Sequence, residues 1–379
     1  MKQNLGVGAW MSVFLISSSI SIAAADILHV SNGNDSGPGS FRQALSEADA
    51  NPSITEIRFD RGYALNLRSS LSYHGSQPLS IDGGQAVIDG GGIERSNILN
   101  IDTAASIVLK NINFRNSHAN GVVVTVPTGA VGNVSVTLDK VSIQQSALYG
   151  LHIDDNFHEK DEGDAGSAAG ILLTINDSVF VDNGVGELDY DGIRVDERGT
   201  GDIVAHVSGS RIDRNGGDGL ELDEGGAGNV ILTMVNSQLD RNGFFNQADL
   251  DDGLDIDEGG AGDVHVTLIG VHANGNYEQG IDLDEYESGT IELAFFDVQA
   301  NDNASEGIKV DEDSDGDILT HFNRVQVKSG GQEGIQIAQQ GVGQVYSALL
   351  DVESPDAGYR VERKEDDGLG KMLLAWLKR

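Results

Sequence analysis

The chain has 379 residues, with 24 Lys and Arg against 60 Asp and Glu, which gives a formal net charge of −36. A body this acidic repels phosphate backbones, which argues against nucleic acid as a partner and favours cations or amine-rich partners. The chain has no cysteine, so disulfides, thiolate metal sites and thiol nucleophiles are excluded. Its 50 glycines and only 5 prolines are typical of many tight turns between short strands.

The N-terminal segment, residues 1–25, has the pattern of a signal peptide. Lys2 precedes an uncharged stretch with an apolar centre at 13–16, and small residues at 23–25 come just before Asp26. The alternative is a retained membrane anchor, but several serines and glycines make the stretch weakly apolar for a spanning helix. We therefore expect a secreted, periplasmic or cell-surface protein with no membrane span after signal removal.

Residues 26–53 are predicted to cap the fold at its N-terminal end. The segment 34–45 reads NDSGPGSFRQAL, in which Ser40 suits the N-cap of a short helix. A stacked sheet needs its open end covered against pairing with other molecules, and a helix can do this. The residues on one side of the expected helix are Phe41, Ala44, Leu45 and Ala48.

A seven-residue motif recurs along the second half of the chain. It reads DGIRVDE, DGLELDE, DGLDIDE, QGIDLDE and EGIKVDE, and its glycines follow one another at intervals of 27, 34, 27 and 27 residues. A fixed period in the twenties indicates one supersecondary unit stacked on itself. The glycines are Gly192, Gly219, Gly253, Gly280 and Gly307.

Each repeat unit is predicted to form three short strands. In residues 218–224 the aliphatic residues alternate with acidic ones, which indicates a strand with one buried face. A second strand follows over 262–268, and a third piece ends near an asparagine such as Asn242, expected to bond turn backbone. The unit lacks the long Ala/Leu/Glu runs of helical repeats, and its period differs from that of the nonapeptide calcium roll. Residues 54–362 are therefore predicted to form a parallel β-helix.

A family resemblance agrees with this prediction. The NDSGPGSFRQAL segment resembles the N-terminal cap of many exported bacterial right-handed β-helix proteins, and the repeats resemble the pectate-lyase-like superfamily. The resemblance implies an all-β, right-handed parallel β-helix with three-strand coils, a repeat of about 27 residues and an N-terminal helical cap. It leaves function open, because the superfamily includes polysaccharide lyases, glycosidases, uronate epimerases and adhesins.

Stacking would place equivalent acidic residues of successive coils about 4.8 Å apart. Like charges at that distance disfavour joint ionisation unless cations bridge them, and Ca²⁺ accepts six to eight oxygen ligands. The alternative is that the repeated Asp-Glu pair only caps turns. A further acidic file stands just before the glycines, at Asp191, Asp218 and Asp252. The candidate calcium ligands are Asp196, Asp223, Glu224, Asp257, Glu258, Asp284, Glu285 and Asp311.

An outward file of mixed charge is the candidate binding surface. Extra residues relative to the 27-residue unit fall after Asp155, near 185–190 and over 243–251, and insertions on one side of a solenoid often mark the binding face. The alternative is loop drift without a role. Insertions also bring Phe157 and His158 near this surface. The candidate binding residues are Arg194, Asp255, Asp282 and Lys309, with an aromatic rim of Tyr190, Phe244 and Phe245.

The C-terminal segment, residues 363–379, is predicted to end in a short amphipathic helix over 369–379. The expected role is a plug on the open solenoid. The alternative is a membrane or partner anchor, because the segment ends in basic residues and carries Trp376.

These features predict an exported acidic β-helix protein that binds divalent cations and engages extracellular polysaccharide or a cell surface without being an enzyme. The alternative is a polysaccharide lyase, glycoside hydrolase or uronate epimerase working on the first-strand face. Lyases of the superfamily hold calcium with Asp or Glu and use Arg or Lys as base, but family motifs are mostly absent, so no catalytic residue is assigned. The glycan, the metal, the attachment partner and the oligomeric state stay open.

Overall fold

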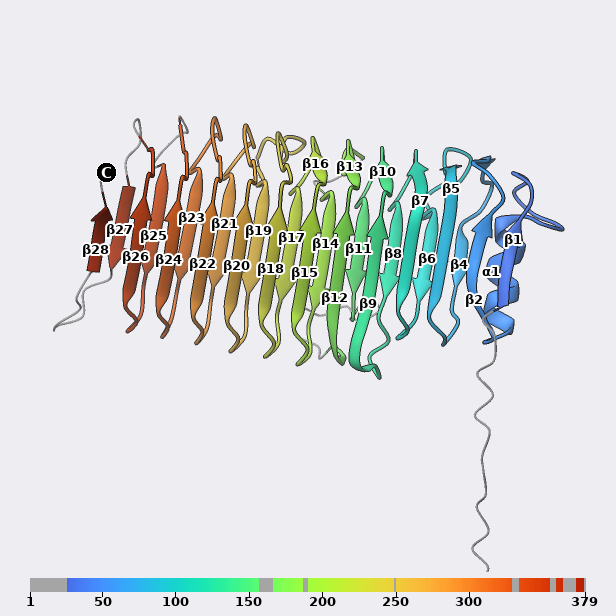
Figure 1. Cartoon of the computed structure of the whole chain (residues 1–379), viewed down its shortest axis with the longest axis horizontal. Coiled ribbons are helices and arrows are strands. Elements are labelled where there is room, and N and C mark those ends of the chain that lie inside the picture. Colours follow the sequence, from blue (N-terminus) through green and yellow to red (C-terminus); the bar gives the residue numbers. More distant parts are fainter. Residues whose placement is uncertain are drawn as a thin grey trace, which may run out of the picture.

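The structure is a computed structural model, and it describes residues 26–156, 166–186, 190–248, 250–328, 334–354, 359–363 and 373–377. These residues form one elongated stack of coils, with the N-terminal and C-terminal coils at opposite ends (Figure 1). The predicted signal peptide lies outside the described residues. No helix among the described residues is long and apolar enough to cross a membrane.

Eleven parallel strands form the first of two sheets, which we call the repeat sheet because it holds every Gly-aliphatic repeat. Its strands are stacked one coil apart, so that Leu220 lies opposite Leu254 and Leu254 opposite Ile281. The strands are β4 (Leu71–Tyr73), β6 (Leu99–Asp102), β8 (Val122–Thr125), β11 (Leu151–Asp154), β14 (Ile193–Glu197), β17 (Leu220–Glu224), β19 (Leu254–Glu258), β21 (Ile281–Glu285), β23 (Ile308–Glu312), β25 (Ile335–Gln339) and β27 (Tyr359–Arg363).

The second sheet, which we call the large sheet, contains the strand that follows the turn after each repeat strand. All its pairings are parallel too. Its main strands are β1 (Asp26–Val30), β2 (Ile54–Phe59), β5 (Leu79–Asp89), β7 (Ile107–Arg115), β9 (Val131–Asp139), β12 (Ala168–Asn176), β15 (Ile203–Ser208), β18 (Val230–Val235), β20 (Val264–Ile269), β22 (Ile291–Phe296), β24 (Ile318–Asn323), β26 (Val345–Leu350) and β28 (Leu373–Leu377).

The third strand of the coil is short. It has three residues in β3 (Ala64–Asn66), β10 (Ser142–Gln144), β13 (Val179–Val181) and β16 (Arg211–Asp213), and these join the large sheet. Beyond β16 it shrinks to a single bridging residue per coil, such as Gln238 and His272. The all-β parallel β-helix predicted from the repeat is thus confirmed.

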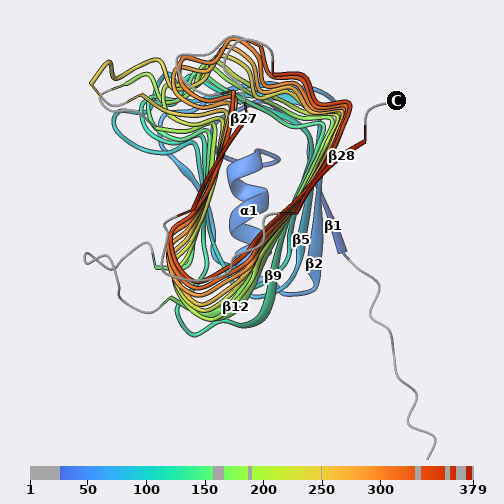
Figure 2. The ribbon, with the colours of Figure 1, turned by 90° about the vertical axis from the view of Figure 1, so that its left-hand side faces the viewer.

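The buried core lies inside the stack, between the two sheets that face each other in Figure 2. Each strand alternates buried and outward residues, so the aliphatic positions of successive coils lie above one another. The predicted inward file is confirmed, because every member is fully buried. Its members are Ile193, Leu220, Leu254, Ile281 and Ile308.

The repeated glycine and asparagine serve the stacking of coils. A Cβ on Gly253 would lie 2.5 Å from Nδ2 of Asn276, so only glycine fits beneath that amide. Nδ2 of Asn242 donates to Oδ1 of Asn276 at 3.2 Å, and the backbone N–H of Asn242 donates to the same oxygen at 2.9 Å. Asn276 bonds Asn303 in the same way although it is 27 rather than 34 residues away. The asparagine file is therefore structural, as predicted.

The N-terminal end carries the predicted helix. Helix α1 (Phe41–Ala50) begins after Ser40, whose side-chain oxygen accepts from the N–H of Gln43 at 3.3 Å. It packs against the first strands, at the N-terminal end of the stack (Figure 1). The buried side chains are the four predicted ones, Phe41, Ala44, Leu45 and Ala48.

The helix predicted for residues 369–379 is wrong for residues 373–377, the part of that segment that the structure describes. Leu373–Leu377 form β28, which pairs in parallel with β26. Without β28, the backbone N–H and C=O groups of β26 would end the sheet unpaired, and pairing satisfies them. This pairing outweighs the helix propensity of a Leu- and Ala-rich segment.

Candidate functional site

The outward side of the repeat sheet carries two straight columns of polar side chains. In each repeat strand the second and fourth residues point outward, and the register sets them beside their equivalents in the next coil. We call this side, from β11 to β23, the acidic face. Its first column is His152, Arg194, Glu221, Asp255, Asp282 and Lys309, and its second is Asp154, Asp196, Asp223, Asp257, Asp284 and Asp311.

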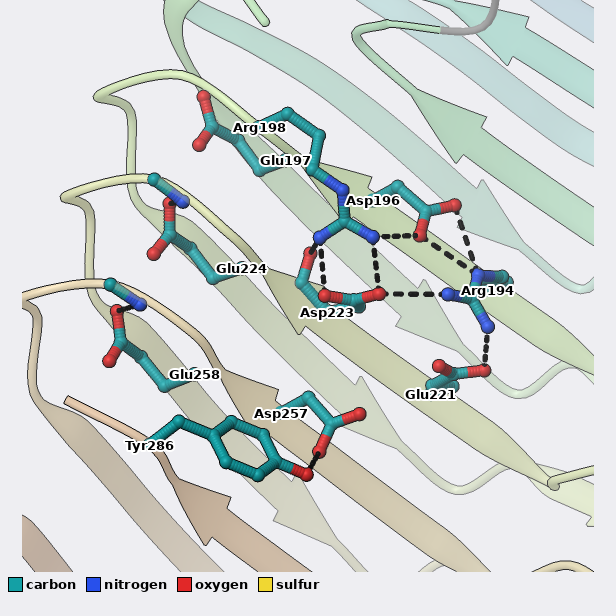
Figure 3. A network of polar contacts seen from close by, with 12 residues as sticks. Arg194, Asp196, Glu197, Arg198, Glu221, Asp223, Glu224, Asp257, Glu258 and Tyr286 are labelled. Atoms are coloured by element: carbon teal, nitrogen blue, oxygen red, sulfur yellow. Dashed lines mark hydrogen bonds and ion pairs between the residues drawn. The ribbon is translucent and has the colours of Figure 1, made fainter. Parts of the chain in front are cut away.

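Two arginines neutralise the carboxylates toward the N-terminal end of the acidic face (Figure 3). Arg194 donates through Nε to Asp196 at 2.9 Å and through Nη2 to Asp223 at 2.8 Å. Arg198 also bonds Asp223 and donates to Asp196 at 3.3 Å. Burial acts to raise the pKa of Asp196, but the hydrogen bond with His152 and the guanidinium of Arg194 outweigh it and lower that pKa to about 2. Two predicted calcium ligands are therefore paired with cationic side chains.

Lys309 neutralises the opposite end. Its Nζ lies 3.0 Å from Asp282, 3.2 Å from Asp284 and 3.5 Å from Asp311. One ammonium group is shared among three carboxylates, so the balance stays acidic. Burial and the charge of Asp284 raise the pKa of Asp282 to about 8, although Lys309 opposes the rise. Burial likewise raises the pKa of Asp284 to about 6.

Between the two ends lies a group of carboxylates that we call the central carboxylate cluster. Among the described residues no Lys or Arg forms an ion pair with Asp218, Asp252 or Asp255, whose nearest carboxylate oxygens all lie within 4.8 Å of one another. Burial raises the pKa of each of these three well above the ordinary value, and the neighbouring carboxylates raise it further. Arg194 reaches only the edge of the cluster. The cluster consists of Asp191, Asp218, Glu221, Asp252 and Asp255.

Each aspartate that precedes a repeat glycine accepts a backbone N–H with one carboxylate oxygen. Its second oxygen is left for a ligand. Oδ1 of Asp191 accepts from the N–H of Asp218 at 2.9 Å, and Oδ1 of Asp218 accepts from the N–H of Asp252. Oδ2 of Asp191 is buried and accepts no hydrogen bond, with Nη1 of Arg194 at 3.9 Å. A buried oxygen without a hydrogen bond fits either a bound cation or a proton shared with the neighbouring carboxyl of Glu221. The donors are all hard oxygens, which suits Ca²⁺ or Mg²⁺ rather than metals that prefer sulfur.

The cluster differs in part from the ligands predicted from the sequence. Of the predicted ligands Asp257 borders it, since its carboxylate lies within 4.8 Å of those of Glu221 and Asp255. Most residues of the cluster are the aspartates that precede the repeat glycines, and this file of aspartates is visible in the sequence. The sequence does not show that the turn at the glycine brings this file beside the first outward column.

The glutamates of the Asp-Glu pair lie on the other side of the strand. Glu197, Glu224, Glu258, Glu285 and Glu312 are buried at the end of each repeat strand, and we call them the glutamate file. They cap the following turn: Oε1 of Glu258, for example, accepts from Gly260 and Gly262 at 3.2 Å. The turn-capping alternative thus holds for these glutamates. The predicted ligands Glu224 and Glu258 do not reach the acidic face (Figure 3). Glu285 is buried in the same register of its strand and does not reach it either.

Burial makes the glutamate file a row of weak acids. It raises the pKa of Glu197 to about 9, that of Glu258 to about 8 and those of the other three to about 7. In four of the five, Oε2 is buried without a hydrogen bond when the carboxyls are counted as charged. A proton on one glutamate lets it donate to the next, which relieves both problems. The next coil carries Gln339, also fully buried, in the same register.

The aromatic rim divides into two places. Tyr190 packs edge-on against Tyr149 at a centroid distance of 4.6 Å. Phe244 lies 5.9 Å from Tyr277, a half-exposed ring that the sequence reasoning missed. The predicted neighbours Phe157 and His158 fall outside the described residues. A pocket of about 330 Å³ lies beside Tyr277, lined by Gln247, Ala248, Leu250, Tyr277, Glu278, Ala304 and Ser305.

A second polar group lies at the N-terminal end of the acidic face. Nε2 of His152 lies 2.7 Å from Oδ2 of Asp196 and 3.7 Å from Asp154, and all three are buried. The ring of Tyr149 packs 4.6 Å from that of His152. Burial, followed by the charge of Asp191, raises the pKa of the Tyr149 phenol. No role was predicted for His152 from the sequence.

No family model matches the chain, and no curated protein matches it. Among solved structures it is similar to pectate lyase Pel9A, with 16% identity and a TM-score of 0.48 over 87% of this chain and 79% of that one. It is similar to the A-module of Azotobacter vinelandii mannuronan C-5 epimerase AlgE4, with 12% identity and a TM-score of 0.39 over 93% and 100%. It is also similar to the Streptococcus pneumoniae surface protein and adhesin PfbA, with 11% identity and a TM-score of 0.40 over 89% and 100%.

Proposed function

We propose that this chain is an exported, non-enzymatic β-helix protein that binds divalent cations, calcium first among them, and engages extracellular polysaccharide or a cell surface through its acidic face. The observation that carries the proposal is the central carboxylate cluster. Arginines neutralise one end of the face and a lysine the other, while Asp218, Asp252 and Asp255 between them have no cationic partner among the described residues. A bound divalent cation would supply the missing positive charge.

Calcium titration tests the cation. Calcium that binds only the folded state raises the melting temperature, and a chelator lowers it again. We expect calorimetry to show binding that is lost when Asp218 and Asp255 are both changed to Asn. The matched control is Asp297→Asn, an exposed aspartate paired with Arg324, which should leave binding intact. A melt that neither calcium nor chelator moves at moderate salt would reject the cation site.

The glycan part of the proposal rests on the aromatic rim beside the acidic face. Rings such as Phe244 and Tyr277 offer stacking surface, and the nearby pocket has room for part of a sugar. A uronate polymer would bind through bridging calcium and through Arg194 and Lys309, whereas a neutral glycan would depend on the rings. Binding of uronate and neutral glycans should therefore be measured with calcium and with chelator. Binding to neither would reject this part.

A polysaccharide-active enzyme is the second candidate, and the Tyr149–His152–Asp196 group favours it. A phenol, an imidazole and a carboxylate in contact are groups that transfer protons. A lyase would release unsaturated sugars, a hydrolase would release reducing ends, and an epimerase would change the uronate ratio. Any such turnover that disappears in His152→Ala, while the melt is retained, would replace the non-enzymatic proposal.

A further inference from the structure

The outer side of the large sheet is almost free of charge on a molecule whose net charge is −36. Each of seven successive strands, β12 to β26, points three side chains outward. Glu292 is the single charged carboxylate among them, and none is Lys or Arg. We call this side the neutral face. Its residues are Leu172, Thr174, Asn176, Val204, His206, Ser208, Ile231, Thr233, Val235, His265, Thr267, Ile269, Glu292, Ala294, Phe296, Leu319, His321, Asn323, Tyr346, Ala348 and Leu350.

The neutral face also exposes apolar side chains. Ile269, Leu319 and Tyr346 are 39%, 37% and 43% exposed. A shallow hollow of about 380 Å³ lies between Leu319 and Tyr346, over the small side chains of Ala294 and Ala348. Contiguous exposed apolar surface on a soluble domain marks an interaction site more often than isolated residues do.

Apart from Glu292, the charged residues lie around this face and not on it. Asp202, Asp263 and Asp317 stand in the turns before the strands, and Asp297 stands after β22, paired with Arg324. A core depleted of charge inside a polar rim is the usual anatomy of a protein interface.

Electrostatics narrows the choice of partner. Two copies of an acidic chain repel each other wherever their carboxylates meet, so a contact through the acidic face is disfavoured. The neutral face is the broad side on which two copies can approach without opposing carboxylate columns. It lies on the other side of the cross-section from the repeat sheet (Figure 2).

The size of the face fits a dimer. Strands of six residues at about 3.3 Å each span about 20 Å, and seven strands at about 4.8 Å span about 34 Å. The resulting patch is on the order of 700 Å² per molecule, close to the roughly 800 Å² per partner of a typical stable interface. Two flat sheets can pack face to face about 10 Å apart, with apolar side chains filling the space between them.

We propose that two copies of this chain associate through their neutral faces around a two-fold axis. Each copy uses the same patch, as in most homodimers. The acidic faces then point away from each other, on the two outer sides of the dimer. The proposal does not depend on the function proposed above, because it requires neither cation nor glycan.

Sedimentation equilibrium of the full chain in chelator tests the dimer, and we expect the mass of two chains. Thr267→Glu places a carboxylate on the central strand β20, so the two copies would face each other with like charges there. This variant should sediment as one chain at the same concentration. The matched control, Thr200→Glu, adds the same charge in an exposed turn and should stay dimeric. Melting curves of both variants verify that they fold.

The dependence of association on salt and calcium distinguishes a dimer through the neutral faces from other kinds of contact. Salt screens repulsion between the two acidic bodies, so added NaCl should hold or tighten the dimer. Three results would overturn the proposal: a wild-type chain with the mass of one molecule up to the highest concentration reached, a dimer that survives Thr267→Glu, or association that requires calcium. A monomer whose neutral face binds a neutral polysaccharide would overturn it as well.

Discussion

The two residues of the Asp-Glu pair are neighbours in the sequence and end up in opposite environments. Asp223 lies on the acidic face between two arginines, whereas Glu224 lies inside and caps a turn. Both belong to columns of stacked carboxylates. The outer column is relieved by Arg194 and Lys309 at its ends and, as proposed, by a cation between them. Among the described residues no Lys or Arg forms an ion pair with the inner column, and burial raises the pKa of its glutamates, so they hold protons more tightly than exposed carboxyls do. The same repulsion is thus relieved in two ways, because cationic side chains reach the ends of the outer column but not the inner column.

The largest loss of stability is expected when a carboxylate is placed on the buried side of a repeat strand instead of its outward side. Leu254 is fully buried and Asp255 points outward beside it. Leu254→Asp should destabilise the protein by about 3–5 kcal/mol, because it buries an unpaired charge and leaves a cavity. Urea unfolding at pH 7 measures this. Asp255→Asn serves as the control and should cost little, since it removes one of several repelling carboxylates. Equal losses of unfolding free energy for Leu254→Asp and Asp255→Asn would contradict the difference between the buried and the outward side of the strand.

The second-largest loss of stability is expected from removing the guanidinium of Arg194 at the N-terminal end of the acidic face. Arg194→Met leaves Glu221 buried without its cationic partner and removes one of the cationic partners of Asp196, and we expect a loss of about 2–4 kcal/mol. The comparison variant is Arg324→Met, whose ion pair with Asp297 is exposed to solvent and should contribute little to stability. Similar melting temperatures for the two variants would show that the arginine cluster does not support the face.

The inner column should respond to pH. Burial raises the pKa of Glu258 to about 8 in the folded chain, above its value when unfolded, so the folded state binds its proton more tightly. The stability from that proton is complete below about pH 4 and is lost as pH rises through about 8. Glu258→Gln should therefore flatten the fall in unfolding free energy between pH 5 and 9 by up to about 1.4 kcal/mol per pH unit.

The chain itself provides the precedent for this variant, because Gln339 continues the glutamate file and donates to the carbonyl oxygen of Ser314 at 2.9 Å. Asp177→Asn, at an exposed turn on the large sheet, is the control and should leave the pH dependence unchanged. Parallel curves for wild type and Glu258→Gln would show that this glutamate does not carry the proton.

The smallest effect on stability should come from the aromatic rim. Changing Phe244 and Phe245 together to Ala removes half-buried rings from a loop that contributes little to coil stacking, so the unfolding free energy should fall by about 0.5 kcal/mol or less. Glycan binding should weaken about tenfold, or about 1.4 kcal/mol. Phe296→Ala on the neutral face is the control for binding. Unchanged glycan binding would place the binding surface elsewhere.

The fold was predictable because the fixed positions within each repeat determine how successive strands align. A glycine, two alternating aliphatic residues and an asparagine at a fixed distance determine which residues stack, and the inward file through Leu254 follows from them. The C-terminal strand was not predictable, since an isolated Leu-rich segment favours a helix and only the free edge of β26 changes that preference. Such an edge is a property of the assembled sheet.

The candidate site was predictable only in part. The columns of the acidic face follow from the repeat, but the aspartate file before the glycines looks like ordinary turn chemistry in the sequence. Only the bend at Gly219 brings Asp218 within reach of Glu221 and Asp255. The inward direction of Glu224 follows from the same alternation that buries Leu222, but turn-capping and metal-binding glutamates look alike until the end of the strand is known.

The asparagine ladder keeps the same hydrogen bond whether 27 or 34 residues separate its members, as the contacts of Asn276 with Asn242 and Asn303 show. The coils that carry this ladder therefore present compatible edges to their neighbours, whatever loop they carry at the corner. Duplication or deletion of a whole coil would join edges that already fit, so descendants of such a gene can change length in steps of one coil. The corner at residues 243–251 can likewise accept a foreign peptide, which the rod would then display at a fixed height along its axis.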